Sequence, residues 1–107
     1  MDDATNTYMF LMTLTEQGAE QLQFANSFVK NVHKNVDDMG GSVTGFYLTM
    51  GPYDLVAIVQ LHDEVEAANL ALAIAADGQV KPITMRAYDA PDSLDALTAM
   101  LGTRGWR

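Results

Sequence analysis

The sequence contains no cysteine, which excludes disulfide bonds, thiol nucleophiles and thiolate zinc sites together. Basic residues are scarce, since 6 lysines and arginines face 14 aspartates and glutamates for a formal net charge of −8. Such a chain lacks the cationic surface with which proteins bind nucleic acids or anionic membranes. We therefore predict no nucleic-acid partner and no membrane partner, and we attribute the acidity to solubility.

Long hydrophobic runs are also absent. The longest apolar stretches, residues 8–14 and 70–76, are much shorter than the roughly 20 residues of a membrane-spanning helix. The first residues include Asp2 and Asp3 in place of the basic start of a secretory signal peptide. These features predict a cytoplasmic protein.

What the chain does contain is enough apolar material for one core. Hydrophobic residues make up 49% of the 107 residues, which fills a single domain and leaves no room for a second. We expect the core of this domain over about residues 8–90. A C-terminal helix and tail are expected over residues 91–107.

The first half of the chain predicts a strand followed by a helix. Residues 8–14 form a continuous apolar run of strand length. Between residues 16 and 39 the apolar positions recur at steps of three and four, as in a helix with one buried face. Gly18 weakens the first turn and Ser27 follows a second capping position, so we expect a short helical turn and then a main helix over about 27–39. Gly40 and Gly41 end it.

The second half predicts a hairpin, a helix and a further strand. The tetrapeptide Gly-Pro-Tyr-Asp at 51–54 separates two apolar strands over 42–50 and 55–61. Asp63 and Glu66 have the spacing of a capping box, which opens a helix that runs to about residue 76, and residues 80–88 form the last strand. The order β-α-β-β-α-β predicts a ferredoxin-like α+β fold, with two helices on one face of an antiparallel four-stranded sheet.

Both faces of the predicted sheet are apolar. An antiparallel sheet covered on one side normally alternates apolar and polar residues. Here the two sides of the strands both consist largely of hydrophobic side chains: Tyr8, Phe10, Met12, Leu14, Phe46, Leu48, Met50, Leu55, Ala57, Val59 and Leu61 against Met9, Leu11, Thr13, Val43, Gly45, Tyr47, Thr49, Val56, Ile58 and Gln60. Two helices can cover only one side, so we predict a homodimer or higher oligomer in which the second sides meet.

Four segments of the sequence carry a family resemblance. Residues 12–18, the pair at 40–41, the hairpin segment 45–54 and the helical segment 70–73 together resemble the GYD-domain proteins of prokaryotes. The resemblance extends over residues 8–88 and implies a dimeric α/β-barrel fold. This implication agrees with the doubly apolar sheet.

Polar residues near the sheet form the candidate ligand site. We expect Thr13, Tyr47, Thr49 and Arg86 to converge in the interior of the dimer, with Asp54 or an anionic ligand opposite the guanidinium. Tyr53 and Asp54 could line its mouth, although a proline turn and an aspartate that bonds backbone amides explain both residues structurally. The hydroxyls could equally bond one another at a dimer interface. No metal site is predicted.

Two functions of different class remain open. The first is a non-enzymatic homo-oligomeric module that binds a small anionic or carbonyl ligand or assembles with partners, and it is favoured because no activated nucleophile or base is evident. The second resembles the cofactor-independent oxygenases and isomerases built on dimeric α/β barrels, with Tyr47, Asp54 and Arg86 around an oxygenated substrate. Neither requires a cofactor.

Overall fold

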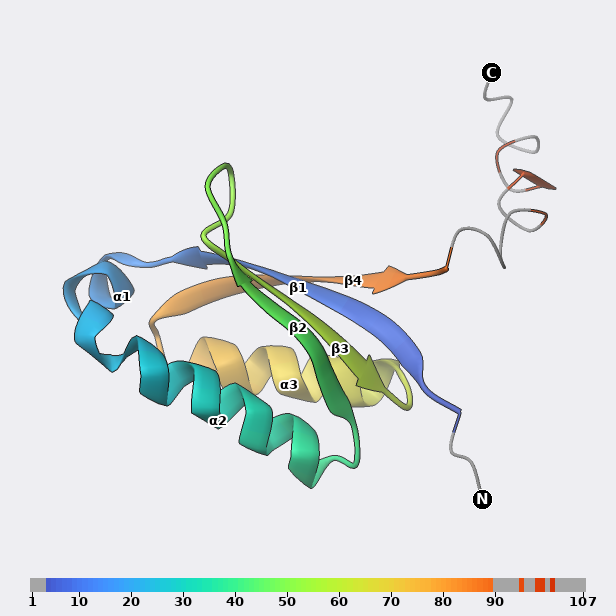
Figure 1. The fold of residues 1–107 in the computed structure, drawn as a ribbon, viewed down its shortest axis with the longest axis horizontal. Coiled ribbons are helices and arrows are strands. Elements are labelled where there is room, and N and C mark those ends of the chain that lie inside the picture. Colours follow the sequence, from blue (N-terminus) through green and yellow to red (C-terminus); the bar gives the residue numbers. More distant parts are fainter. Residues whose placement is uncertain (1–3, 90–94, 96–97, 100, 102–107) are drawn as a thin grey trace.

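The computed structural model describes residues 4–89, 95, 98–99 and 101. Four strands form one antiparallel sheet in the order β2-β3-β1-β4, and the helices lie along one side of it (Figure 1). This arrangement confirms the predicted ferredoxin-like α+β fold. The elements are β1 (Asn6–Leu14), α1 (Glu16–Glu20), a 3-10 turn (Leu22–Phe24), α2 (Ala25–Asp38), β2 (Ser42–Leu48), β3 (Leu55–Leu61), α3 (Glu64–Ala76) and β4 (Val80–Ala87).

The short helix α1 begins where its sequence provides a cap. The Thr15 hydroxyl accepts a hydrogen bond from the Gly18 amide at 3.0 Å and donates one to the Gly78 carbonyl at 2.6 Å, which ties α1 to the start of β4. The predicted order of a short turn and then a main helix is confirmed. The main helix α2 begins at Ala25, two residues before the expected Ser27, because the 3-10 turn leads directly into it.

The ends of the long helices follow their local sequence. Gly40 has a φ of 78°, the left-handed conformation that glycine tolerates, and the Gly41 amide donates to the Val36 carbonyl at 3.0 Å. At α3 the Asp63 carboxylate accepts from the Glu66 amide at 2.9 Å, as predicted. The Glu66 carboxylate accepts from the His62 amide at 2.7 Å, so the reciprocal bond of the capping box is shifted by one residue.

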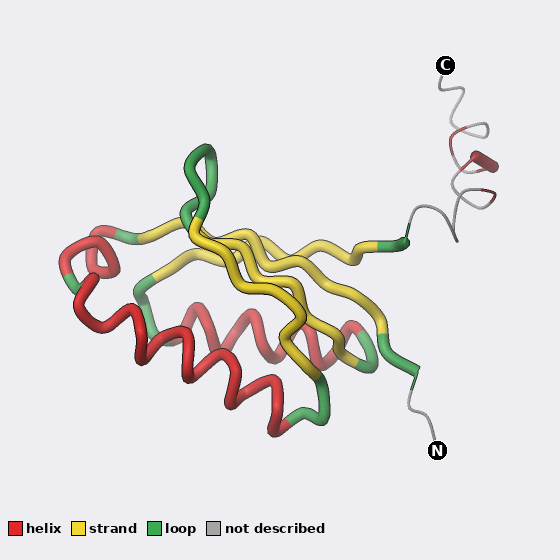
Figure 2. The backbone as a smooth tube through the Cα atoms, in the orientation of Figure 1, coloured by secondary structure: helices red, strands yellow, loops and turns green. Residues whose placement is uncertain are grey.

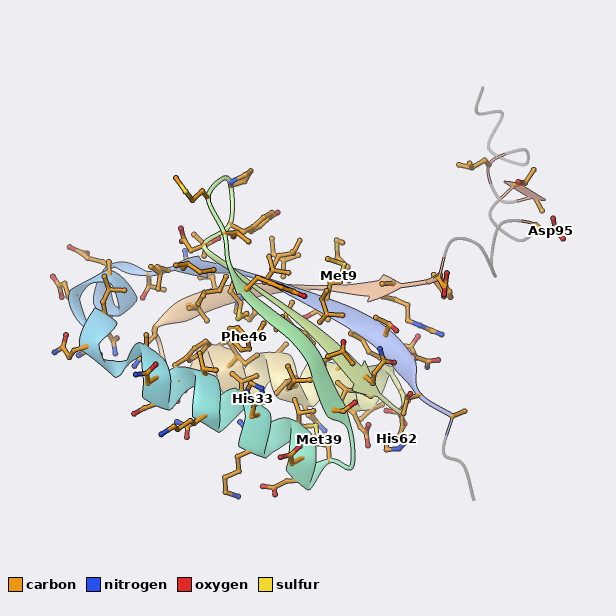
Figure 3. All side chains as sticks on the ribbon, in the orientation of Figure 1. Met9, His33, Met39, Phe46, His62 and Asp95 are labelled. Carbon is orange, nitrogen blue, oxygen red and sulfur yellow. The ribbon has the colours of Figure 1, made fainter. Side chains whose placement is uncertain are left out.

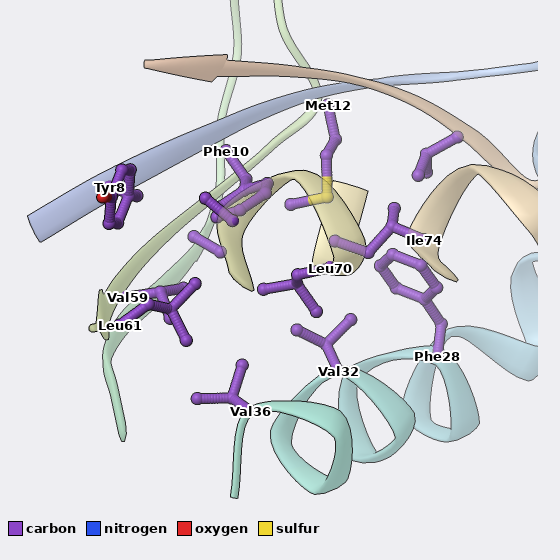
Figure 4. Packing of buried hydrophobic residues seen from close by; sticks show 13 residues of the cluster. Tyr8, Phe10, Met12, Phe28, Val32, Val36, Val59, Leu61, Leu70 and Ile74 are labelled. Carbon is purple, nitrogen blue, oxygen red and sulfur yellow. The ribbon is translucent and has the colours of Figure 1, made fainter. Parts of the chain in front are cut away.

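The core lies between the sheet and the two long helices (Figures 2 and 4). From β1, the side chains of Tyr8, Phe10 and Met12 enter it and are at most 1% exposed. They meet the apolar faces of α2 and α3 and the buried side of β3, which contribute Phe28, Val32, Val36, Ala57, Val59, Leu61, Ala67, Leu70 and Ile74. One side of the sheet is thereby buried by the chain itself.

An irregularity in β2 overturns one expectation. The alternation places Val43 on the same side as Gly45 and Tyr47, and this prediction is wrong. A β-bulge between Val43 and Gly45 shifts the register, so Val43 opposes Val59 on the helix-covered side and packs against the core. The extra residue is Thr44, whose hydroxyl donates to the Ile58 carbonyl at 3.2 Å.

The predicted C-terminal helix falls mostly outside the described residues. Of this segment only Asp95, Thr98, Ala99 and Leu101 are described, and they have helical backbone conformation. Within the described chain, the helices are too short and too polar for any of them to cross a bilayer.

Candidate interaction surface on the open sheet face

The side of the sheet opposite the helices carries no covering element in the described chain (Figure 1). The strand register defines its members, because residues paired across strands share a side. Met9 pairs with Ile58 and Met85, and Figure 3 shows Met9 on the side away from the helices. We call this surface the open sheet face, and it comprises Thr7, Met9, Leu11, Thr13, Ser42, Gly45, Tyr47, Val56, Ile58, Gln60, Lys81, Ile83, Met85 and Ala87.

The open sheet face is apolar and almost uncharged. Tyr47, Ile83 and Met85 are 53%, 49% and 44% exposed, far more than core residues of their size. Lys81, opposite Thr13 in the register, is the only charged member of the set. An apolar surface that extends across four strands is typical of an interaction site, because a soluble monomer rarely leaves one in water.

The ring of Tyr47 packs over Gly45, two residues earlier in β2. A Cβ atom on Gly45 would lie 2.7 Å from Cε2 of the Tyr47 ring. The ring therefore lies closer to the strand backbone than a residue with a side chain at position 45 would allow. The ring thus lies against β2 as part of the open sheet face.

The hairpin residues are engaged in backbone bonds. The Thr49 hydroxyl donates to the Tyr53 carbonyl at 2.6 Å, and the Thr49 amide donates to the Asp54 carbonyl at 2.9 Å. Asp54 then joins the hairpin to β1, since its amide donates to the Met12 carbonyl at 2.9 Å and its carboxylate accepts from the Leu14 amide at 2.8 Å. These contacts support the structural interpretation of Tyr53 and Asp54.

Arg86 lies on the other side of the sheet. It pairs with Tyr8 in the register, and its guanidinium carbon is 5.8 Å from the centroid of the Tyr8 ring and 4.7 Å from that of Tyr88. Its Nη1 is 3.5 Å from a carboxylate oxygen of Glu64 at the start of α3. The predicted convergence of Arg86 with Thr13, Tyr47 and Thr49 is therefore wrong, and the protein carboxylate that the guanidinium meets is that of Glu64 and not that of Asp54.

Arg86 and its neighbour Tyr8 each have a buried polar atom. The Tyr8 hydroxyl and Arg86 Nε are both buried without a hydrogen-bond partner. They lie on the helix-covered side, so the polar groups proposed to face a ligand are divided between the two sides of the sheet. Sequence reasoning missed Lys81, Ile83 and Met85, although their alternate spacing in β4 could have revealed them.

The cavity beside α1 is too small for a ligand. Near α1 a cavity of about 20 Å³, lined by Leu14, Leu22, Phe28 and Leu55 among others, has space for about one water molecule. Among the described residues, no three histidine, aspartate or glutamate side chains are grouped as a metal site would require. The open sheet face is therefore the strongest candidate for function.

The sequence resembles known proteins. Residues 8–101 match the family described as the GYD domain. A protein of Thermus thermophilus named "Glutamine synthetase and cystathionine beta-lyase binding protein" is 35% identical over 92 residues, which cover 85% of this chain and 97% of that protein.

Solved structures share the fold. A feast or famine regulatory protein from M. tuberculosis, complexed with L-methionine, superposes with a TM-score of 0.60 at 13% identity, over 78% of this chain and 50% of that one. A Thermus thermophilus protein superposes with a TM-score of 0.52 at 24% identity, over 79% of this chain and 95% of that one. The chain thus spans about half the length of the regulatory protein.

Proposed function

We propose, from the premise that this chain belongs to the GYD domain family, that it is a non-enzymatic assembly module. Two copies pair through the open sheet face, and the pair binds a partner protein. The observation that carries this proposal is the apolar, nearly uncharged side of the sheet, which no helix of the described chain covers.

A second copy suits this face because of where the charge lies. The chain carries a formal net charge of −8, which opposes contact between like molecules. The open sheet face contributes none of that negative charge, so two copies can meet there without bringing carboxylates together. Burial of its apolar side chains contributes about 25 cal/mol per Å². In such a pair the two sheets form the dimeric α/β barrel that the family resemblance implies.

Binding of proteins is favoured over binding of a metabolite by the same geometry. Arg86 is on the far side of the sheet from Tyr47, and Asp54 bonds the Leu14 amide, so the predicted anion site is not assembled. The enzymatic alternative relied on Tyr47, Asp54 and Arg86 together and loses its support for the same reason. The name of the Thermus thermophilus relative, a binding protein of two enzymes, supports the assembly role.

The pairing is tested by changing one exposed residue of the face. Light scattering at micromolar concentration should give the parent twice its chain mass of 11.7 kDa. Tyr47→Glu should be a folded monomer, because a side chain that is 53% exposed in the single chain tolerates a carboxylate there but not inside an interface. Asn31→Glu adds the same charge to the exposed side of α2 and should stay paired. A parent of 11.7 kDa would overturn the proposal.

The partner role is tested with purified enzymes. Immobilised parent protein should bind glutamine synthetase or cystathionine beta-lyase saturably in surface plasmon resonance, with serum albumin as the negative control. A paired protein that binds neither enzyme would remove the partner role while leaving the pairing intact.

A further inference from the structure

Helix α3 exposes a second apolar surface, separate from the open sheet face. Its buried side consists of Ala67, Leu70 and Ile74. On the opposite side Val65 and Leu72 are 67% and 70% exposed. We call this side the α3 outer stripe, and it comprises Val65, Ala68, Asn69, Leu72, Ala75 and Ala76. The stripe contains no charged residue over three turns of helix.

Helix α2 occupies an equivalent place in the fold but has a charged outer side, so this place does not require an apolar one. Both helices cover the same side of the sheet (Figure 1). The solvent side of α2 carries Lys30, Lys34, Asp37 and Asp38, and Lys34 forms an ion pair with Asp38 at 2.9 Å. That is the usual composition of a surface helix, whereas a helix that is apolar all round is normally buried. The composition of the α3 outer stripe is therefore that of a surface covered by another molecule.

The spacing along the stripe suits another helix. Val65 and Leu72 are seven residues apart, as are Ala68 and Ala75, so the four positions form the a/d seam of a short coiled-coil contact. The two alanines leave room for the backbone or side chains of an opposing helix. An amphipathic helix that places its own apolar side chains along this seam would bury Val65 and Leu72.

Charge at the two ends of the stripe decides what kind of helix fits. Asp63 and Glu64 stand at its start and Asp77 at its end, and residues 35–80 contain no lysine or arginine. The Glu64 side chain is 75% exposed and meets Arg86 only at 3.5 Å, so its carboxylate remains accessible. Two copies joined through this stripe would bring acidic ends together in either direction. A partner with basic ends would be attracted.

We propose that the α3 outer stripe docks an amphipathic helix of the partner protein, with an apolar stripe and with lysine or arginine at both ends. This inference rests on the proposed function and identifies the surface through which the assembled pair meets its partner. The open sheet face joins like copies, and the acidic, apolar α3 outer stripe receives an unlike one.

The probe is a synthetic helical peptide of about 18 residues, long enough to fold on the stripe, with leucines at coiled-coil spacing and lysines at both ends. Its binding to the full chain is followed by fluorescence anisotropy. We expect saturation at micromolar concentrations. Replacing the lysines by glutamates should weaken binding by about tenfold or more, because the acidic ends then repel the peptide. Equal binding of the two peptides would overturn the charge requirement and with it the proposal.

Protein variants locate the contact. Leu72→Gln removes an apolar side chain that solvent already reaches, so the fold should survive, and peptide affinity should fall by about tenfold as for a central interface residue. Leu22→Gln makes the same change at a leucine that is 58% exposed outside the stripe and should leave affinity within about twofold. Equal affinity of Leu72→Gln and the parent, or no binding by the parent, would overturn the proposal.

Further outcomes separate this inference from the pairing proposal. A monomeric Tyr47→Glu that still binds the peptide would support the α3 outer stripe independently of the open sheet face. Loss of pairing in Leu72→Gln, with Tyr47→Glu still paired, would assign the stripe to a second copy and overturn both proposals. A peptide of residues 90–107 is also tested as a competitor of the basic peptide. If it displaces the basic peptide from the parent but not from Leu72→Gln, the stripe binds the chain's own C-terminal segment, and the proposal of a partner helix is overturned.

Discussion

At the scale of single residues, Asp54 has the clearest task. Regular pairing between β1 and β3 ends at Met12 and Leu55, which leaves the Leu14 amide without a strand partner on that side. The Asp54 carboxylate accepts from this amide at 2.8 Å, while the Asp54 amide continues the strand pairing through the Met12 carbonyl. Asp54 thus extends the pairing of β1 with the hairpin from Met12 to Leu14.

We expect Asp54→Ala to lower the free energy of unfolding by about 1 to 2 kcal/mol, because it leaves the half-buried Leu14 amide without its acceptor. Urea denaturation followed by circular dichroism measures the change. Asp37→Ala removes the same charge from the exposed side of α2 and serves as the control. If both variants unfold alike, the contact does not stabilise the fold.

Among the elements, α1 depends on a close approach between two backbones. Gly18 is buried, and a Cβ atom at this position would overlap the carbonyl oxygen of Gln79. The same carbonyl accepts a hydrogen bond from the Thr15 amide at 2.9 Å, so it cannot easily move away. The junction between the end of β1 and the start of β4 therefore requires glycine at residue 18.

Gly18→Ala should lower the free energy of unfolding by about 1 to 3 kcal/mol, the usual cost of forcing an atom into a filled space. Alanine has the higher helix propensity, so propensity alone predicts the opposite sign. Chemical denaturation shows whether the variant is less or more stable than the parent. Ala19→Ser is the control, because it adds one atom at the exposed neighbouring position. A more stable Gly18→Ala variant would show that β4 can shift away from α1.

For the whole molecule, the open sheet face links stability to concentration. If folded chains pair through this face, mass action favours the folded state as protein concentration rises. A monomer has no such dependence. The melting temperature therefore reports the pairing without any labelled partner.

We expect the melting temperature of the parent to rise by about 3 °C for each tenfold increase in concentration, from the usual unfolding entropy of chains this size. Differential scanning calorimetry measures the slope. Asn31→Glu should keep the slope of the parent, whereas Tyr47→Glu should show none. A flat dependence in the parent would count against pairing through the open sheet face.

Much of the fold could be predicted because its determinants are local. The left-handed Gly40 ends α2 and Asp63 caps α3, each within a few residues of the feature that it controls. The order of strands and helices follows, and with it the ferredoxin-like fold. The excess of apolar residues over what two helices can cover is likewise evident from composition and alternation alone.

The candidate site could not be predicted in the same way, since it depends on which side of the sheet each residue occupies. A bulge at Thr44 turned Val43 to the helix-covered side, against the core, and the pairing of β4 with β1 placed Arg86 beside Tyr8 instead of Tyr47. Because side chains alternate with a period of two, a shift of one residue sends a whole strand segment to the other side. The sequence by itself determined the elements and their order. Only strand pairing in the tertiary structure decided which side chains meet.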